Sequence, residues 1–89
     1  MLGLRKRNGD LEMTVQLKHE VAVDLITFKM NALQRTLDEI LTLWKQPTAD
    51  EFVAKVRSGE IPDGELDAIT VRQLLLDLSR LTQLLQQVK

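Results

Sequence analysis

Residues 23–44 read VDLITFKMNALQRTLDEILTLW, and the spacing of their apolar side chains decides the fold class. These side chains recur at alternating intervals of three and four residues, which is the heptad pattern by which one α-helix packs along another. The pattern predicts a helix over residues 19–46. This helix has to end before Pro47, because proline disfavours helical geometry in the residue that precedes it. The series consists of Val23, Ile26, Met30, Leu33, Leu37, Ile40 and Trp44.

A short second helix is expected directly after Pro47. Thr48 is followed three residues later by Glu51, and this pair forms a capping box whose side chains satisfy the free backbone N–H groups at a helix start. Gly59 supplies the left-handed residue with which many helices end. We therefore expect a helix over residues 49–58.

The C-terminal part of the chain repeats the heptad spacing. The segment GEIPDGELD, residues 59–67, is acidic and rich in turn residues, so it predicts a loop. A long helix is expected over residues 70–88, with Thr70 as its cap together with Gln73. Its series consists of Val71, Leu74, Leu78, Leu81, Leu85 and Val88.

The apolar faces of both long helices are wider than one partner helix can cover. The two can form an antiparallel hairpin with the short helix across one end, yet apolar residues beside both series would stay uncovered, and monomers avoid such patches. The chain has 89 residues, no cysteine and one histidine, so neither a disulfide nor a protein-only zinc site is expected to supplement its small core. We therefore predict a mainly α homodimer in which two hairpins close a four-helix bundle. The residues beside the two series are Leu25, Phe28, Leu41, Leu43, Leu75, Leu76 and Leu84.

Residues 11–89 are expected to form one helical domain. Its heptad residues are the predicted interface, either with a second copy, which we favour, or with a different protein. This interface consists of Ile26, Met30, Leu33, Leu37, Ile40, Trp44, Val71, Leu74, Leu78, Leu81 and Leu85.

Residues 11–18, LEMTVQLK, depart from the helical pattern. Apolar and polar residues alternate from Leu11 to Lys18, which is the period of a β-strand with one buried face. A single strand has no partner inside so short a chain. We therefore expect this N-terminal strand to pair with its own copy across the twofold axis of the dimer.

The N-terminus is the only basic region of a chain whose net charge is −1. Residues 1–10 are expected to form a flexible basic arm. A two-stranded ribbon fits the major groove of DNA, whereas Glu12 on its polar face would be repelled by phosphates. Two interpretations stay open: a plain dimerising strand, or a ribbon that binds DNA weakly. The candidate DNA-binding residues are Arg5, Lys6 and Arg7 of the arm and Thr14, Gln16 and Lys18 of the strand.

No motif in the chain indicates catalysis. His19 lies beside Glu20 at the expected helix start, a position typical of a surface residue, and the acidic residues between 60 and 67 lack the spacing of a calcium loop. We expect no enzymatic activity, no cofactor and no metal. No apolar run approaches the ~18 residues that a membrane span requires, and no apolar stretch of a signal peptide follows the basic start. A cytoplasmic protein without membrane contact is therefore expected.

Three segments resemble small helical antitoxins of prokaryotic toxin–antitoxin modules. These are the helix start TADEF (residues 48–52), the helix stop KVRSGE (residues 55–60) and the leucine-rich residues 71–81. VQLKHEVAVDL (residues 15–25) is also similar to the strand-to-helix entry of ribbon-helix-helix antitoxins, although the expected first helix is much longer than theirs. The resemblance implies a non-enzymatic homodimer that binds a partner toxin, with operator DNA as a further candidate partner. The alternative is a structural helical-bundle adaptor without a nucleic-acid role.

Overall fold

The computed structural model describes the backbone of residues 8–88 and the side chains of residues 18–88. Three α-helices make up most of this range: α1 (Asn8–Leu43), α2 (Ala49–Arg57) and α3 (Glu65–Val88). A single 3₁₀ turn, η2 (Pro62–Gly64), precedes α3, and residues 8–88 contain no strand. The predicted helical class is therefore confirmed.

Residues 11–18 belong to α1, so the predicted N-terminal strand is wrong. A helix satisfies its backbone hydrogen bonds within one segment, whereas a lone strand leaves them open. The alternating pattern is also compatible with a helix. Apolar residues that recur every two positions include pairs four positions apart, such as Leu11 and Val15, and residues four apart lie on the same side of a helix. The expected flexible arm also changes: residues 8–10 start α1, and residues 1–7 lie outside the described residues.

The end of α1 is fixed by a residue with a positive φ. Lys45 has φ 57°, and its backbone N–H donates to Thr42 O while that of Gln46 donates to Leu41 O, at 3.1 and 2.9 Å. This pair of bonds is the Schellman pattern that normally places glycine where Lys45 stands. The helix therefore ends at Leu43, three residues before the predicted position.

Both ends predicted for α2 are present, although only the Thr48 half of the capping box forms a hydrogen bond. Thr48 Oγ1 accepts a hydrogen bond of 3.1 Å from the backbone N–H of Glu51. At the other end Gly59 has φ 90°, and its N–H donates to Val56 O at 3.1 Å. The helix runs from Ala49 to Arg57, within one residue of the prediction.

The third helix begins earlier than predicted. Residues 62–64 form η2, and α3 starts at Glu65 instead of residue 70. Acidic Glu65 and Asp67 stand in its first turn, where the helix dipole favours negative charge. Thr70 is not a cap, because it lies inside α3 and its hydroxyl donates to Leu66 O at 3.2 Å.

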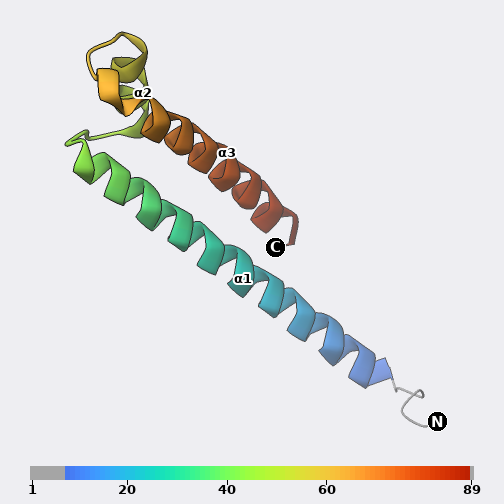
Figure 1. Ribbon diagram of the computed structural model, residues 1–89. Coiled ribbons are helices and arrows are strands. Elements are labelled where there is room, and N and C mark those ends of the chain that lie inside the picture. The colour runs from blue at the N-terminus through green and yellow to red at the C-terminus, as the bar shows by residue number, and fades with distance from the viewer. Residues whose placement is uncertain (1–7, 89) are drawn as a thin grey trace.

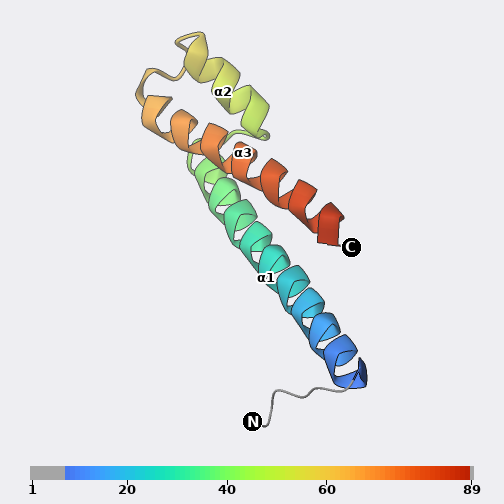
Figure 2. The same cartoon turned by 90° about the vertical axis from the view of Figure 1, so that its right-hand side faces the viewer.

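The helices α1 and α3 lie side by side and run in opposite directions, with α2 packed at one end of the pair (Figures 1 and 2). The core lies at this end. Phe52 of α2 and Val71 of α3 are completely buried there and pack with residues from all three helices. The buried cluster consists of Leu37, Phe52, Ala68, Val71 and Leu74.

The N-terminal part of α1 extends beyond the end of α3 (Figure 1). With 36 residues α1 is about 54 Å long, whereas the 24 residues of α3 span about 36 Å. The radius of gyration is 20.0 Å, against about 12 Å for a compact chain of this length. The fold is therefore a rod of 66 × 20 × 19 Å with its core at one end.

Candidate functional site

The predicted heptad interface lies within the single chain. All eleven of its residues are buried or half-buried, and Leu37, Val71 and Leu74 belong to the core at the α2 end. The two heptad series therefore pack largely against each other. Only the half-buried members of the two series, further along the α1–α3 pair, keep exposed surface that a second protein could contact.

Away from α2 the α1–α3 pair is only two helices thick. Of the side chains that the structure describes (residues 18–88), Ile26 is the one buried hydrophobic residue outside the core cluster, with 8% of its surface exposed. The other predicted interface residues along this part of the pair remain half-buried, because no third helix covers them. They are Met30, Leu81 and Leu85, together with Leu33 and Leu78, which also pack against the core cluster.

A second apolar series runs along α1 on a different side from the heptad series. Val21, Leu25 and Phe28 are separated by four and three residues and share one side of the helix. Leu25 and Phe28 expose 63% and 71% of their surface, and Ala32 continues the spacing. We call Val21, Leu25, Phe28 and Ala32 the outer series of α1.

The helix α3 also carries large exposed side chains. Leu66, Ile69 and Leu76 are exposed, Leu66 to 79%, and their spacing of three and seven residues places them toward one side of the helix. We call these three residues the α3 outer face. Beside it an open hollow of about 370 Å³ lies between α2 and α3 and is lined by Val53, Val56, Arg57, Glu65, Ala68, Ile69 and Arg72.

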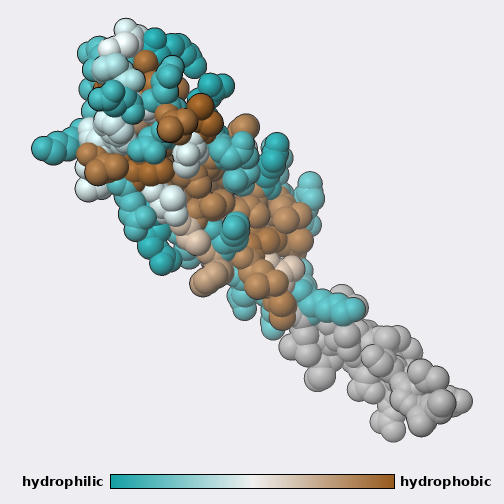
Figure 3. Space-filling model, viewed as in Figure 1, coloured by the Kyte–Doolittle hydropathy of each residue, from teal (hydrophilic) through white to brown (hydrophobic). Residues whose placement is uncertain are grey.

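Exposed apolar surface is a property of the whole α1–α3 pair. Figure 3 shows hydrophobic atoms in a band along the pair, from the α2 end toward the N-terminal part, with hydrophilic atoms at its borders. Leu43 and Leu84 add to the exposed apolar residues of α1 and α3. Contiguous patches of this kind mark protein-binding sites more often than ordinary monomer surface.

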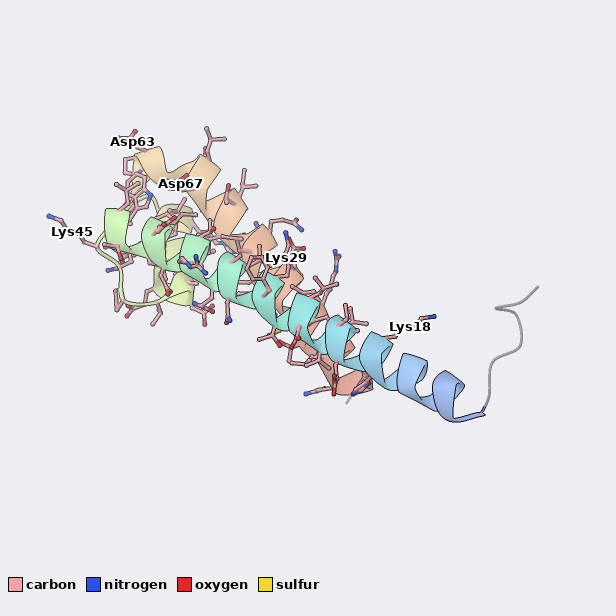
Figure 4. The ribbon with its side chains drawn as sticks, turned by 90° about the horizontal axis from the view of Figure 1, so that it is seen from below. Lys18, Lys29, Lys45, Asp63 and Asp67 are labelled. Carbon is pink, nitrogen blue, oxygen red and sulfur yellow. The ribbon has the colours of Figure 1, made fainter. Side chains whose placement is uncertain are left out.

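The titratable residues of the described part do not converge on a catalytic arrangement. His19 is exposed, and no group of three or more His, Cys, Asp or Glu side chains in this part could hold a metal ion. Of the acidic residues between 60 and 67, Asp67 accepts a hydrogen bond of 2.8 Å from the indole of Trp44. Figure 4 shows Asp63 and Asp67 at the α2 end, far along the rod from Lys18.

The residues predicted to bind DNA are not arranged as a ribbon. Thr14, Gln16 and Lys18 lie in α1, so the ribbon that would have entered the major groove is absent. Lys18 is exposed, while the side chains of Thr14 and Gln16 lie outside the described residues, as do Arg5, Lys6 and Arg7 altogether. The basic charge of the N-terminal region is therefore the one feature that still supports the prediction of DNA binding.

The outer series was not recognised from the sequence as a surface of its own. By their spacing alone Leu25 and Phe28 widen the heptad face, whereas in the structure both lie on another side of α1 and are exposed. The signal was present: counting alternate steps of three and four from Lys18 gives Val21, Leu25, Phe28, Ala32, Arg35 and Glu39. This second heptad series is apolar at its centre and charged at both ends.

Comparison with known proteins identifies no relative of this chain: no family model matches it, and neither a curated protein nor a solved structure is similar to it. The resemblance to antitoxins thus stays a prediction based on capping and turn motifs. None of the helices in the described part is long and apolar enough to cross a membrane.

Proposed function

We propose that this protein is a non-enzymatic protein-binding module, an antitoxin-like homodimer that binds a second protein through exposed apolar helix surface. One observation carries the proposal. Among the described side chains of α1 and α3, eight large hydrophobic residues are more than two-fifths exposed, including Phe28 at 71% and Leu66 at 79%. Burying such side chains against another polypeptide stabilises each by about 1.5–3 kcal/mol.

The α3 outer face suits a partner different from the chain itself. Ile69 lines the hollow between α2 and α3, and Arg57 and Arg72 line the same hollow. The hollow combines apolar side chains with Arg57, Arg72 and one carboxylate, that of Glu65, so its charged groups are net positive. It fits an amphipathic helix or extended segment that carries carboxylates, because arginine binds carboxylates with two parallel hydrogen bonds. We assign the partner protein to this face.

The experiment is a growth-neutralisation assay with the product of any small gene found next to the gene of this protein. If that product is toxic, co-expression of this protein should restore growth. Ile69→Glu and Leu76→Glu should abolish rescue, since a charge in an apolar interface is costly. Gln86→Glu is the matched control, because Gln86 is exposed on α3 outside this face. Rescue that survives both apolar-to-Glu variants would contradict the assignment, and a neighbour without toxicity would leave the adaptor role.

Operator binding is a separate part of the proposal and rests on charge alone. Phosphate contacts release counterions, so affinity for DNA would fall steeply as salt rises. A gel-shift titration on the region upstream of the gene should show this slope. Simultaneous replacement of Arg5, Lys6 and Arg7 by alanine should flatten it. No shift at low salt would remove DNA from the list of partners.

A further inference from the structure

The outer series of α1 has the pattern of a helix-pairing seam. Its four apolar residues follow intervals of four, three and four, the heptad spacing with which one helix lies along another. Lys18 and Arg35 continue the spacing at the two ends and are both exposed. The seam is therefore about five helical turns long, with an apolar centre between two basic ends.

The exposed area of the chain matches what an obligate dimer buries. The chain exposes 6997 Å², whereas a compact monomer of 10.2 kDa exposes about 5,300 Å². The excess is about 1,700 Å², and obligate homodimers bury roughly 1,000–2,500 Å² per subunit. A second copy of the chain that covered this excess would bury an area within the range of stable dimers.

The position of the outer series suits a twofold axis. The midpoint of α1 lies between Leu25 and Ile26, and the midpoint of the outer series lies one residue further along. Two copies of α1 that pair antiparallel about this point would therefore overlap over almost their whole length. The N-terminal part of α1, which extends beyond α3 in its own chain (Figure 2), would lie beside α1 of the second copy.

From these observations we propose that α1 pairs antiparallel with α1 of a second copy through the outer series. Leu25 then faces Phe28 of the second copy, and Val21 faces Ala32. This inference rests on the homodimer of the proposed function and specifies its interface. It differs from the bundle expected from the sequence, because the contacts are made by the outer series and not by the heptad residues between α1 and α3.

The test compares the mass of matched variants by light scattering across a wide range of concentration. The native chain should have the mass of a dimer. Phe28→Glu and Leu25→Glu should each give a monomer with unchanged helix content, because both residues are exposed within one chain. Thr27→Glu introduces the same charge at the neighbouring exposed position outside the outer series and should remain dimeric.

A native chain that is monomeric throughout, or a Phe28→Glu variant that remains a dimer, would overturn the inference. A variant that fails to fold would be recognised by circular dichroism; Leu25→Ser then replaces it, with the same expected loss of dimer. Growth rescue that survives Ile69→Glu and Leu76→Glu while the native chain is a dimer contradicts the partner-binding proposal instead, so the two failures can be told apart.

The charged ends of the seam test its direction. In the antiparallel pair Lys18 faces Arg35 of the second copy, so each dimer contains two repulsive contacts. Lys18→Glu converts both into ion pairs and should lower the dissociation constant about fivefold or more. Arg35→Glu should do the same, and the double variant should lose the gain because two glutamates then face each other. In a parallel pair Lys18 would face Lys18, and Lys18→Glu would give no gain; that result would overturn the antiparallel direction.

Discussion

The indole Nε1 of Trp44 donates a hydrogen bond of 2.8 Å to Oδ2 of Asp67, which joins the C-terminal end of α1 to the first turn of α3. The bond is part-buried and spans 23 positions of the sequence. The Trp44 ring also lies 5.7 Å from that of Phe52, at a tilt of 32°. Trp44 thus connects α1 to both other helices at the core end of the rod.

Removal of this hydrogen bond should destabilise the fold. Asp67→Ala should lower the free energy of unfolding by about 1–2 kcal/mol, because hydrogen bonds to charged groups are stronger than neutral ones. The same substitution should cost much less in a Trp44→Phe background, where the donor is absent. Urea unfolding at one fixed protein concentration measures both differences. Asp63→Ala, an exposed acidic residue nearby, is the control. Equal costs in the two backgrounds would show that the bond contributes nothing.

The sequence predicted α2 and the helical class because their signals are local and agree with one another. Thr48 and Gly59 each fix one end of α2, and no competing pattern lies between them. The prediction failed where two local signals compete. Residues 11–18 contain both the alternation of a strand and the four-residue spacing of a helix. At the start of α3 the hydroxyl of Thr70 and the acidic residues from Glu65 onward are competing helix-start signals, and the helix begins at Glu65.

The outer series could not be separated from the heptad face by counting alone. An apolar residue beside a heptad series can contact the helix that packs on that series, or it can contact a different partner. Which of the two it contacts depends on where the packed helix lies. Phe28 is exposed because α3 packs along the other side of α1, a tertiary fact that the spacing within α1 does not contain. The same reason explains why Ile26, two positions earlier, is buried.

Lys45 should be a site where the protein can be stabilised. It holds a left-handed φ of 57° at the end of α1, a conformation that costs non-glycine residues about 1 kcal/mol or more. Lys45→Gly should therefore raise the free energy of unfolding by about 0.5–1 kcal/mol, after allowance for the greater freedom of glycine in the unfolded chain. Lys45→Ala removes the charge but keeps the side-chain strain, so it should give no gain. Thermal melts of the native protein and the two variants measure the difference in stability. Equal gains from Lys45→Gly and Lys45→Ala would show that removal of the charge, and not relief of the backbone strain, stabilises the protein.

Gly64 is required by close packing and not by its backbone angle. A Cβ atom at this position would lie 2.9 Å from Val56 Cγ2 and 3.0 Å from Ile61 Cγ2. Gly64→Ala should therefore destabilise the fold by about 1–3 kcal/mol through overpacking. Val56→Ala removes one of the clashing methyl groups and should restore part of this loss. At Gly59 a Cβ atom meets nothing within 4 Å and φ is positive, so Val56→Ala should not rescue Gly59→Ala. Chemical unfolding of the single and double variants measures these differences, and it separates the steric clash at Gly64 from the backbone strain at Gly59.

The two phenylalanines separate the stability of one chain from that of the dimer. Phe52 is completely buried and Phe28 is 71% exposed. Phe52→Ala should therefore cost about 3–5 kcal/mol by leaving a cavity in the core, and the loss should be seen at every protein concentration. Phe28→Ala removes no contact within the core, so it should lower the melting temperature only where the native chain is dimeric, and the two should converge on dilution. Melting curves measured over a range of concentrations provide the comparison. A Phe28→Ala deficit that persists undiminished in dilute solution would assign Phe28 to the stability of the single chain.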